Sequence, residues 1–143
     1  MKITNKRANY EYKLEGDRVE AGISLSGGEA KAIRTGHADI NQSVARVVND
    51  EIFLINANIP IPEAQKYSST RTRKLLLHRD EIVSLTTKMK QFKLTLVPTN
   101  LYNKGRLIKV TLALGKPKRE FEKKEAIKRK DIERELEKEF KLR

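Results

Sequence analysis

Apolar and polar positions alternate over much of the first 114 residues, a period of two that is typical of half-buried β-strands. Turn residues separate these runs at Gly16-Asp17, Asn49-Asp50 and Asn103-Lys104-Gly105, and such residues favour tight hairpin connections. Residues 59–62 cannot form a central strand, because their two prolines remove backbone donors. The pattern therefore predicts strands over residues 10–14, 19–25, 43–48, 51–57, 91–98 and 106–114.

Helical spacing replaces this alternation in two places. Ser26 precedes Gly27-Gly28-Glu29 and is expected to cap a short helix. A second, amphipathic helix, capped by Ser69 or Thr70, is predicted from the spacing of Leu75, Ile82, Leu85 and Met89. Strands interleaved with two or three short helices suit a mainly β fold. We predict a closed antiparallel barrel of the oligonucleotide-binding (OB-like) type, with about six strands and a basic C-terminal tail.

The chain carries 31 basic and 19 acidic residues among 143, a net charge of +12, which favours a polyanionic partner. It contains no cysteine, so disulfides, thiolate metal sites and cysteine nucleophiles are excluded. The histidines, His37 and His78, are too far apart in sequence for a local metal-binding pair. No apolar run approaches the roughly 18 residues of a membrane span, and the opening residues do not suggest a signal peptide. We expect a cytoplasmic protein without a membrane partner.

The charge divides at Gly115-Lys116-Pro117, where glycine and proline predict a hinge. Residues 1–114 hold 19 basic and 11 acidic side chains, and residues 115–143 hold 12 and 8. We therefore predict a barrel over 1–114 and a charged tail over 115–143. Acid-first pairs four residues apart and an apolar stripe indicate a tail helix, and each pair contributes only about 0.2–0.5 kcal/mol. Such a tail is expected to be disordered alone and helical when docked, although it could also be a solvated segment without a role.

A run of basic residues is the strongest local indication of binding. Five basic residues and no acid lie between positions 66 and 79. At the start of the predicted helix, Arg71, Arg73 and Lys74 would direct cationic groups at one locus, which is a phosphate site. The alternative is a cationic helix face that neighbouring acids offset. Residues that would extend the electropositive surface are Lys6, Arg7, Lys31 and Arg34. A general OB-type binder of single-stranded or ribosomal RNA would need only such a surface.

Enzymatic chemistry finds little support in the sequence. The chain lacks the G-x-x-x-x-G-K-[ST] phosphate-binding loop. Glu20, Glu29 and Asp39 could hold Mg²⁺ for a nuclease, although their spacing does not require it, and either histidine could act as a general acid. We expect a non-enzymatic protein without a metal or cofactor, with the magnesium-dependent nuclease as the alternative.

Five motifs and a basic tail follow one another along nearly the whole chain. They are Asn5-Lys6-Arg7-Ala8, Glu20-Ala21-Gly22-Ile23, Gly28-Glu29-Ala30-Lys31-Ala32-Ile33-Arg34-x-Gly36, Arg71-x-Arg73-Lys74-Leu75-Leu76-Leu77-His78 and Thr95-Leu96-Val97-Pro98. In these motifs the chain resembles the small protein B family, the bacterial SsrA-binding proteins, which bind transfer-messenger RNA (tmRNA) in trans-translation.

The resemblance implies an RNA-binding barrel that performs no covalent chemistry. It would bind the tRNA-like domain of tmRNA, deliver it to the decoding site of a stalled ribosome and place its tail in the empty mRNA channel. Elongation factor Tu would join through the shared RNA, and the protein would act as a monomer in ribosome rescue. The family's RNA-contacting positions match Asn5, Glu20, Leu76, Leu77 and His78. Glu20 would accept hydrogen bonds from base amino groups and so confer specificity.

The tail departs from the family pattern at one position. The family's Gly-Lys-Lys corresponds to Pro117-Lys118-Arg119, and its Asp-Lys-Arg corresponds to Glu122-Lys123-Lys124. Proline in place of glycine alters the flexibility expected of the hinge, whereas the charges are kept and Phe121 retains a ring able to stack on ribosomal RNA. The ribosome-contacting residues are therefore predicted to be Lys118, Arg119, Phe121, Glu122, Lys123, Lys124 and Lys128.

Overall fold

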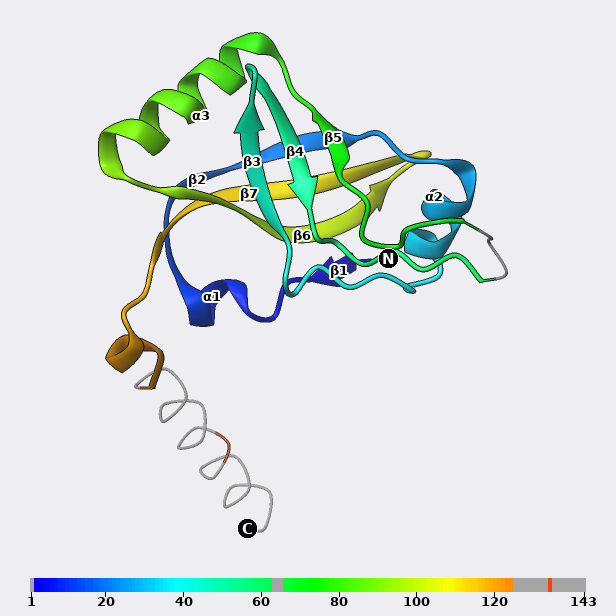
Figure 1. Ribbon diagram of the computed structural model, residues 1–143, viewed down its shortest axis with the longest axis horizontal. Coiled ribbons are helices and arrows are strands. Elements are labelled where there is room, and N and C mark those ends of the chain that lie inside the picture. The colour runs from blue at the N-terminus through cyan, green and yellow to red at the C-terminus, as the bar shows by residue number, and fades with distance from the viewer. Residues whose placement is uncertain (1, 63–65, 125–133, 135–143) are drawn as a thin grey trace.

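Antiparallel β-strands form most of the structure, a computed structural model that describes residues 2–62, 66–124 and 134 (Figure 1). The strands are β1 (Lys2–Thr4), β2 (Tyr12–Ile23), β3 (Val44–Val48), β4 (Glu51–Ile55), β5 (Arg73–Leu76), β6 (Thr95–Lys104) and β7 (Leu107–Pro117). The helices of the described residues are α1 (Ala8–Glu11), α2 (Gly27–Arg34) and α3 (Arg79–Phe92), with a further helical turn over residues 120–124. The prediction of a mainly antiparallel β fold with a few short helices is confirmed.

Each strand from β2 to β7 is hydrogen-bonded to a neighbour on both sides. The order is β1-β6-β3-β4-β5-β2-β7, and β7 also pairs with β6. β6 bonds β3 through Leu96, β1 through residues 100–102, and β7 along most of its length. Pairing on both sides satisfies the backbone groups that an open edge strand would expose.

Aliphatic side chains from this sheet form the core. The fully buried leucine and isoleucine residues of β4, β6 and β7 are Ile52, Leu54, Leu96, Leu101 and Leu112. Ile33 of α2 and Leu85 of α3 pack into the same cluster. Burying one such side chain contributes about 1.5–3 kcal/mol, so packing against the sheet holds both helices, which are short enough to be marginal alone.

Two local predictions from turn and cap residues are confirmed. Asn49 and Asp50 connect β3 to β4 with φ angles of 50° and 62°, the left-handed conformation that a two-residue hairpin requires at both positions. Ser26 caps α2: its hydroxyl accepts a hydrogen bond from the Glu29 amide at 3.3 Å, and the Glu29 carboxylate accepts one from the Ser26 amide at 2.9 Å. This reciprocal pair satisfies two helix-end donors.

The second predicted helix starts later than its spacing suggested. Residues 73–76 form β5, which lies between β4 and β2, and the helix begins only at Arg79. In β5 the side chains of Arg73 and Leu75 are buried while those of Lys74 and Leu76 are exposed. The prediction of a helix from residue 69 is therefore wrong, because pairing with two strands overrides the local spacing.

Two predicted breaks lie within strands. The turn expected at Gly16-Asp17 is a bulge in β2, which pairs with β7 both before it and after it. The hinge expected at residues 115–117 is the end of β7, where Gly115 is buried and pairs with Leu14. Both predictions are wrong for the same reason: the long partner strand continues past the turn-forming residue.

A buried carboxylate, Glu29 of α2, is the centre of a polar cluster beneath the sheet surface. Its oxygens accept hydrogen bonds from Arg73 Nε at 2.6 Å, Arg71 Nε at 3.0 Å and the Tyr67 hydroxyl at 2.9 Å. Glu29 and Arg73 are both 0% exposed. Burial alone would raise the pKa of Glu29, but the hydrogen bonds from Arg71, Ser26, Arg73 and Tyr67 outweigh it and lower that pKa from 4.5 to about 2.

We predict that Glu29→Gln lowers the free energy of unfolding by about 3–5 kcal/mol at neutral pH, because it leaves the Arg73 charge buried without a carboxylate. Urea unfolding followed by circular dichroism measures this change. The matched control is Glu51→Gln, which removes the exposed ion pair to Lys74 and is expected to change stability by about 0–1 kcal/mol. Equal effects of the two substitutions would contradict the role assigned to Glu29.

The same cluster predicts a pH dependence. Because the folded-state pKa of Glu29 is depressed, its contribution is complete above pH 4.5 and is lost as the pH falls toward 2, an effect of about 3 kcal/mol. The stability difference between the wild type and Glu29→Gln should therefore shrink over that range in urea titrations at successive pH values. A difference that stays constant down to pH 2.5 would show that Glu29 does not carry the effect.

Candidate nucleic-acid interface

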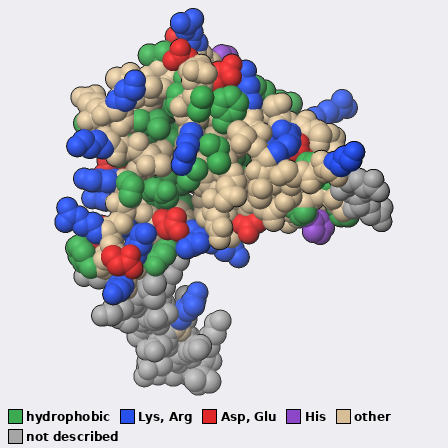
Figure 2. Space-filling view, in the orientation of Figure 1, with side chains coloured by type: hydrophobic (Ala, Val, Ile, Leu, Met, Phe, Trp, Pro, Cys, Tyr) green, Lys and Arg blue, Asp and Glu red, His purple; other side chains and the backbone are tan. Residues whose placement is uncertain are grey.

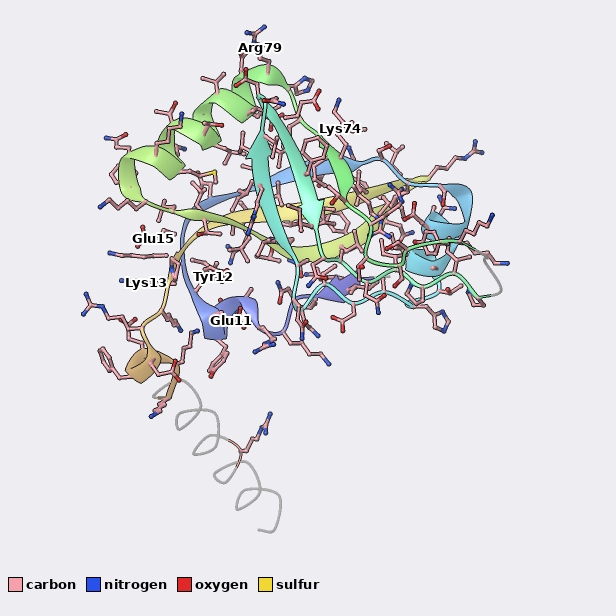
Figure 3. All side chains as sticks on the ribbon, viewed as in Figure 1. Glu11, Tyr12, Lys13, Glu15, Lys74 and Arg79 are labelled. Carbon is pink, nitrogen blue, oxygen red and sulfur yellow. The ribbon has the colours of Figure 1, made fainter. Side chains whose placement is uncertain are left out.

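The basic cluster of residues 66–79 does not form a single phosphate site. Arg73 points into the protein, where its guanidinium also donates to the carbonyls of Ala57 and Ser69. Arg71 is half-buried on Glu29. Lys74 faces solvent and pairs with Glu51 at 3.1 Å; Figure 3 shows it at the upper edge, away from the start of β2. The RNA contact predicted for Arg73 is wrong, because strand alternation turns that side chain inward.

A groove lined by apolar and basic residues lies between the end of β2, α2, the end of β5 and the start of β7. Its lining residues are Gly22, Ile23, Leu25, Ala30, Arg34, Leu76, Arg106, Leu107, Ile108 and Lys109. We call it the Leu76–Leu107 groove, after two leucines that are 53% and 62% exposed. Three of its residues are cationic and none is acidic, so the groove suits a ligand with flat apolar surfaces and negative charges.

Arg34 joins the two walls of the groove. Its guanidinium donates a hydrogen bond to the Arg106 carbonyl at 2.7 Å, which ties the last turn of α2 to the β6–β7 turn. Lys109 pairs with Gly22 across β2 and β7, and Gly22 pairs with Leu76 on its other side. The predicted residues Arg34 and Leu76 therefore meet in one place although they lie far apart in the sequence.

Glu20 lies two residues before Gly22 on β2 and faces the same side of the sheet. The Tyr102 hydroxyl donates a hydrogen bond to one Glu20 oxygen, and Lys104 Nζ lies 3.5 Å from the other. The Tyr102 bond, helped by Lys104 and Lys109, lowers the pKa of Glu20 below its usual value. Glu20 is therefore an ionised carboxylate that Tyr102 and Lys104 hold in place. Its side chain is 38% exposed and can accept further hydrogen bonds.

The N-terminal candidates divide into one anchor and two surface cations. Asn5 is 6% exposed; its side-chain Nδ2 donates to the Pro98 carbonyl at 2.8 Å and its side-chain Oδ1 accepts from the Arg7 backbone amide at 3.1 Å. Lys6 and Arg7 are exposed, and Arg7 pairs with Glu11 at 3.1 Å. Asn5 therefore positions the segment, while an RNA contact by its own side chain stays a prediction.

The remaining body candidates do not line the groove. Lys31 is exposed on α2 beside a separate hollow formed with Pro60 and Pro62. Leu77 is half-buried and lines another hollow with Lys74. His78 is exposed at the start of α3, where its amide donates to the Glu81 carboxylate at 3.1 Å. Their RNA contacts stay predictions.

The tail candidates begin directly after β7. Arg119, Phe121 and Lys124 are exposed, with Phe121 at 57%, and Glu122 and Lys123 are half-buried on the helical turn of residues 120–124. Lys118 is half-buried and bonded to α1. Lys128 lies outside the described residues, as do the apolar stripe of the tail and its acid-first pairs other than Glu120–Lys124.

Sequence reasoning missed Arg106, Leu107 and Lys109. They follow the turn at Gly105, and the alternation of buried Ile108 and Val110 with Leu107 and Lys109 places the latter outward. An outward leucine flanked by basic residues was the available signal. Figure 2 shows why charge counting could not find them: lysine and arginine side chains are spread around the visible face.

The acidic side chains that the structure describes do not gather into a metal site. In residues 2–62, 66–124 and 134, no group of three His, Asp or Glu side chains could hold a metal ion, and Glu29, one of the three carboxylates proposed for a nuclease, is bound to arginines. No described helix is long and apolar enough to cross a membrane.

Comparison with known proteins finds relatives along nearly the whole chain. An SsrA-binding protein of Chloroflexus aggregans is 43% identical over 97% of this chain and 90% of its own length. That of Burkholderia vietnamiensis is 46% identical, over 93% of this chain and 92% of its own length. A solved structure described as "tmRNA-SmpB: a journey to the center of the bacterial ribosome" contains a chain 38% identical, with a TM-score of 0.68 over 88% of this chain and 94% of that one.

The family model described as SmpB protein matches residues 2–142. The match includes the segments that build the Leu76–Leu107 groove, the Glu20 site and the tail. The chain therefore belongs to the SmpB protein family.

Proposed function

We propose that this protein binds tmRNA in trans-translation and delivers it to stalled ribosomes. The observation that carries the proposal is the Leu76–Leu107 groove near Glu20, which combines apolar and basic lining residues, in a chain whose relatives are SsrA-binding proteins. The solved structure whose description names tmRNA-SmpB and the bacterial ribosome supports the same partners.

The groove gives the tRNA-like domain two kinds of contact. Arg34, Arg106 and Lys109 neutralise backbone phosphates, which supplies affinity that weakens with salt. Leu76 and Leu107 offer exposed apolar surface to an unstacked base or ribose. Ionised Glu20 accepts hydrogen bonds from base amino groups and adds specificity, because an RNA without a donor there leaves the carboxylate unpaired.

The tail contacts the ribosome in this proposal. Exposed Arg119, Phe121 and Lys124 begin a basic segment that enters the empty mRNA channel, where Phe121 stacks on a ribosomal base. Elongation factor Tu binds the same tmRNA, the protein acts as a monomer in the cytoplasm, and it performs no covalent chemistry.

The ring of strand pairings supports a finer fold assignment. The pairings pass from β6 through β3, β4, β5, β2 and β7 and return to β6. We propose that these strands form a closed OB-like barrel. The RNA-binding body then ends with β7 at Pro117 and the tail follows it.

We predict that neutralising the basic residues of the groove weakens tRNA-like RNA binding and flattens its salt dependence. Replacing Arg34, Arg106 and Lys109 by Gln should reduce the slope of log K against log salt by about 0.7–0.9 for each phosphate that the variant no longer neutralises. Filter binding or anisotropy at several salt concentrations measures the slope. The matched control replaces Lys88, Lys90 and Lys93 by Gln at the far end of α3. An unchanged slope in the groove variant would place the RNA elsewhere.

Deletion of residues 125–143 is expected to separate the two RNA surfaces. The groove and Glu20 remain, so affinity for the tRNA-like domain should change by less than about threefold, within the usual range of a surface change. Peptide tagging on stalled ribosomes should be abolished, because only the first residues of the channel-binding segment, up to Lys124, remain. A reconstituted tagging assay beside an RNA-binding assay measures both. A deletion variant that no longer binds the RNA, or that still tags, would contradict this division.

A further inference from the structure

The first residue after β7 is bound to a helix from the other end of the chain. The Lys118 amide donates to the Glu11 carbonyl at 2.9 Å, and Lys118 Nζ donates to the Asn9 carbonyl at 2.6 Å. The last carbonyls of a helix lack intrahelical partners and carry partial negative charge. α1 has no basic residue in its own last turn, so Lys118 supplies the cation from outside.

The strand that leads to Lys118 is also held. Pro117 pairs with Tyr12, and Lys116 with Lys13. Gly115 is packed so closely that a Cβ added to it would lie 2.9 Å from Tyr12 Cβ, so side chains of β2 pack directly on β7 at the point where a hinge was expected. Pro117 then fixes its own φ angle. The chain has little freedom before Lys118.

α1 is itself fixed to the body on its other side. The residue before it, Arg7, is bonded through its amide to Asn5, whose side chain holds the Pro98 carbonyl. Arg7 also pairs with Glu11 across α1. Figure 3 shows Glu11 and Tyr12 at the lower left of the body, where β2 begins and the tail leaves. The tail therefore begins next to a helix that is itself fixed to the body.

We infer that Lys118 is a positioning residue that sets the direction in which the tail leaves the body. Its ammonium group is hydrogen-bonded to α1 and is not directed at RNA. We therefore assign Lys118 this positioning role in place of the ribosome contact predicted from the sequence. The direction is a property of the free protein. The consequence of this direction for tagging rests on the proposed function. A tail that already points in the bound direction loses less conformational entropy when it enters the ribosome.

Distance measurements by electron paramagnetic resonance test the inference. The chain has no cysteine, so spin labels can be attached at Val83→Cys on α3 and Glu120→Cys on the helical turn, both exposed positions. The wild type should give a narrow distance distribution. Lys118→Met, which keeps the aliphatic stem and removes the donor, should broaden it, whereas Lys118→Arg should keep it narrower than Met does. Lys116→Met, at an exposed position of β7, is the matched control and should not change it.

Tagging and RNA binding complete the test. Lys118→Met should lower tagging about tenfold, the effect expected from removing one charge-assisted hydrogen bond, with unchanged affinity for the tRNA-like domain. An unchanged distance distribution would overturn the inference, as would a fall in RNA affinity without broadening. Thermal unfolding checks that each variant is folded, and Lys118→Gln provides a second variant. If the wild type fails to bind the tRNA-like RNA, the proposed function fails, but the distance result still decides the role of Lys118.

Discussion

The buried pair of Glu29 and Arg73 is the interaction on which the arrangement of the interface depends. Glu29 lies in the first turn of α2 and Arg73 is the first residue of β5, so their 2.6 Å contact fixes a helix against a strand. Both charges are removed from water, and such a pair is stable only when its remaining hydrogen-bonding groups are satisfied. Here carbonyls, Tyr67 and Arg71 satisfy them, and no buried side-chain polar atom in the described residues lacks a partner.

This pair determines where the groove lies. Arg34 ends the helix that carries Glu29 in its first turn, and Leu76 ends the strand that Arg73 begins, so the buried contact sets the spacing of the two walls of the Leu76–Leu107 groove. The buried charges thus fix the geometry, while the proposed function assigns RNA binding to exposed Arg34 and Arg106 and half-buried Lys109. Arginine residues thus have two different roles in this chain: buried Arg73 fixes the fold, and exposed Arg34 and Arg106 remain available to a ligand.

Much of the fold could be predicted because it depends on local chemistry. Asn49-Asp50 has the residues of a tight hairpin, and Ser26 with Glu29 has those of a capping box, so both predictions held. The helix expected from residue 69 failed where a strand with two partners competed with it. In the interface, Glu20, Arg34 and Leu76 were identified through the family resemblance or their charge, while Leu107 was missed because it lies at the start of β7, outside every motif.

The sequence by itself determined the mainly β class, the excess of positive charge and the membership suggested by its motifs, since alternation, composition and short motifs are readable along the chain. Only the tertiary structure decided which cations are available to RNA. Arg71 and Arg73 find their partner Glu29 42 and 44 residues away, and Lys118 finds Asn9 109 residues away. The sequence shows which side chains are charged, but whether a charge is neutralised depends on contacts that form only when distant segments pack together.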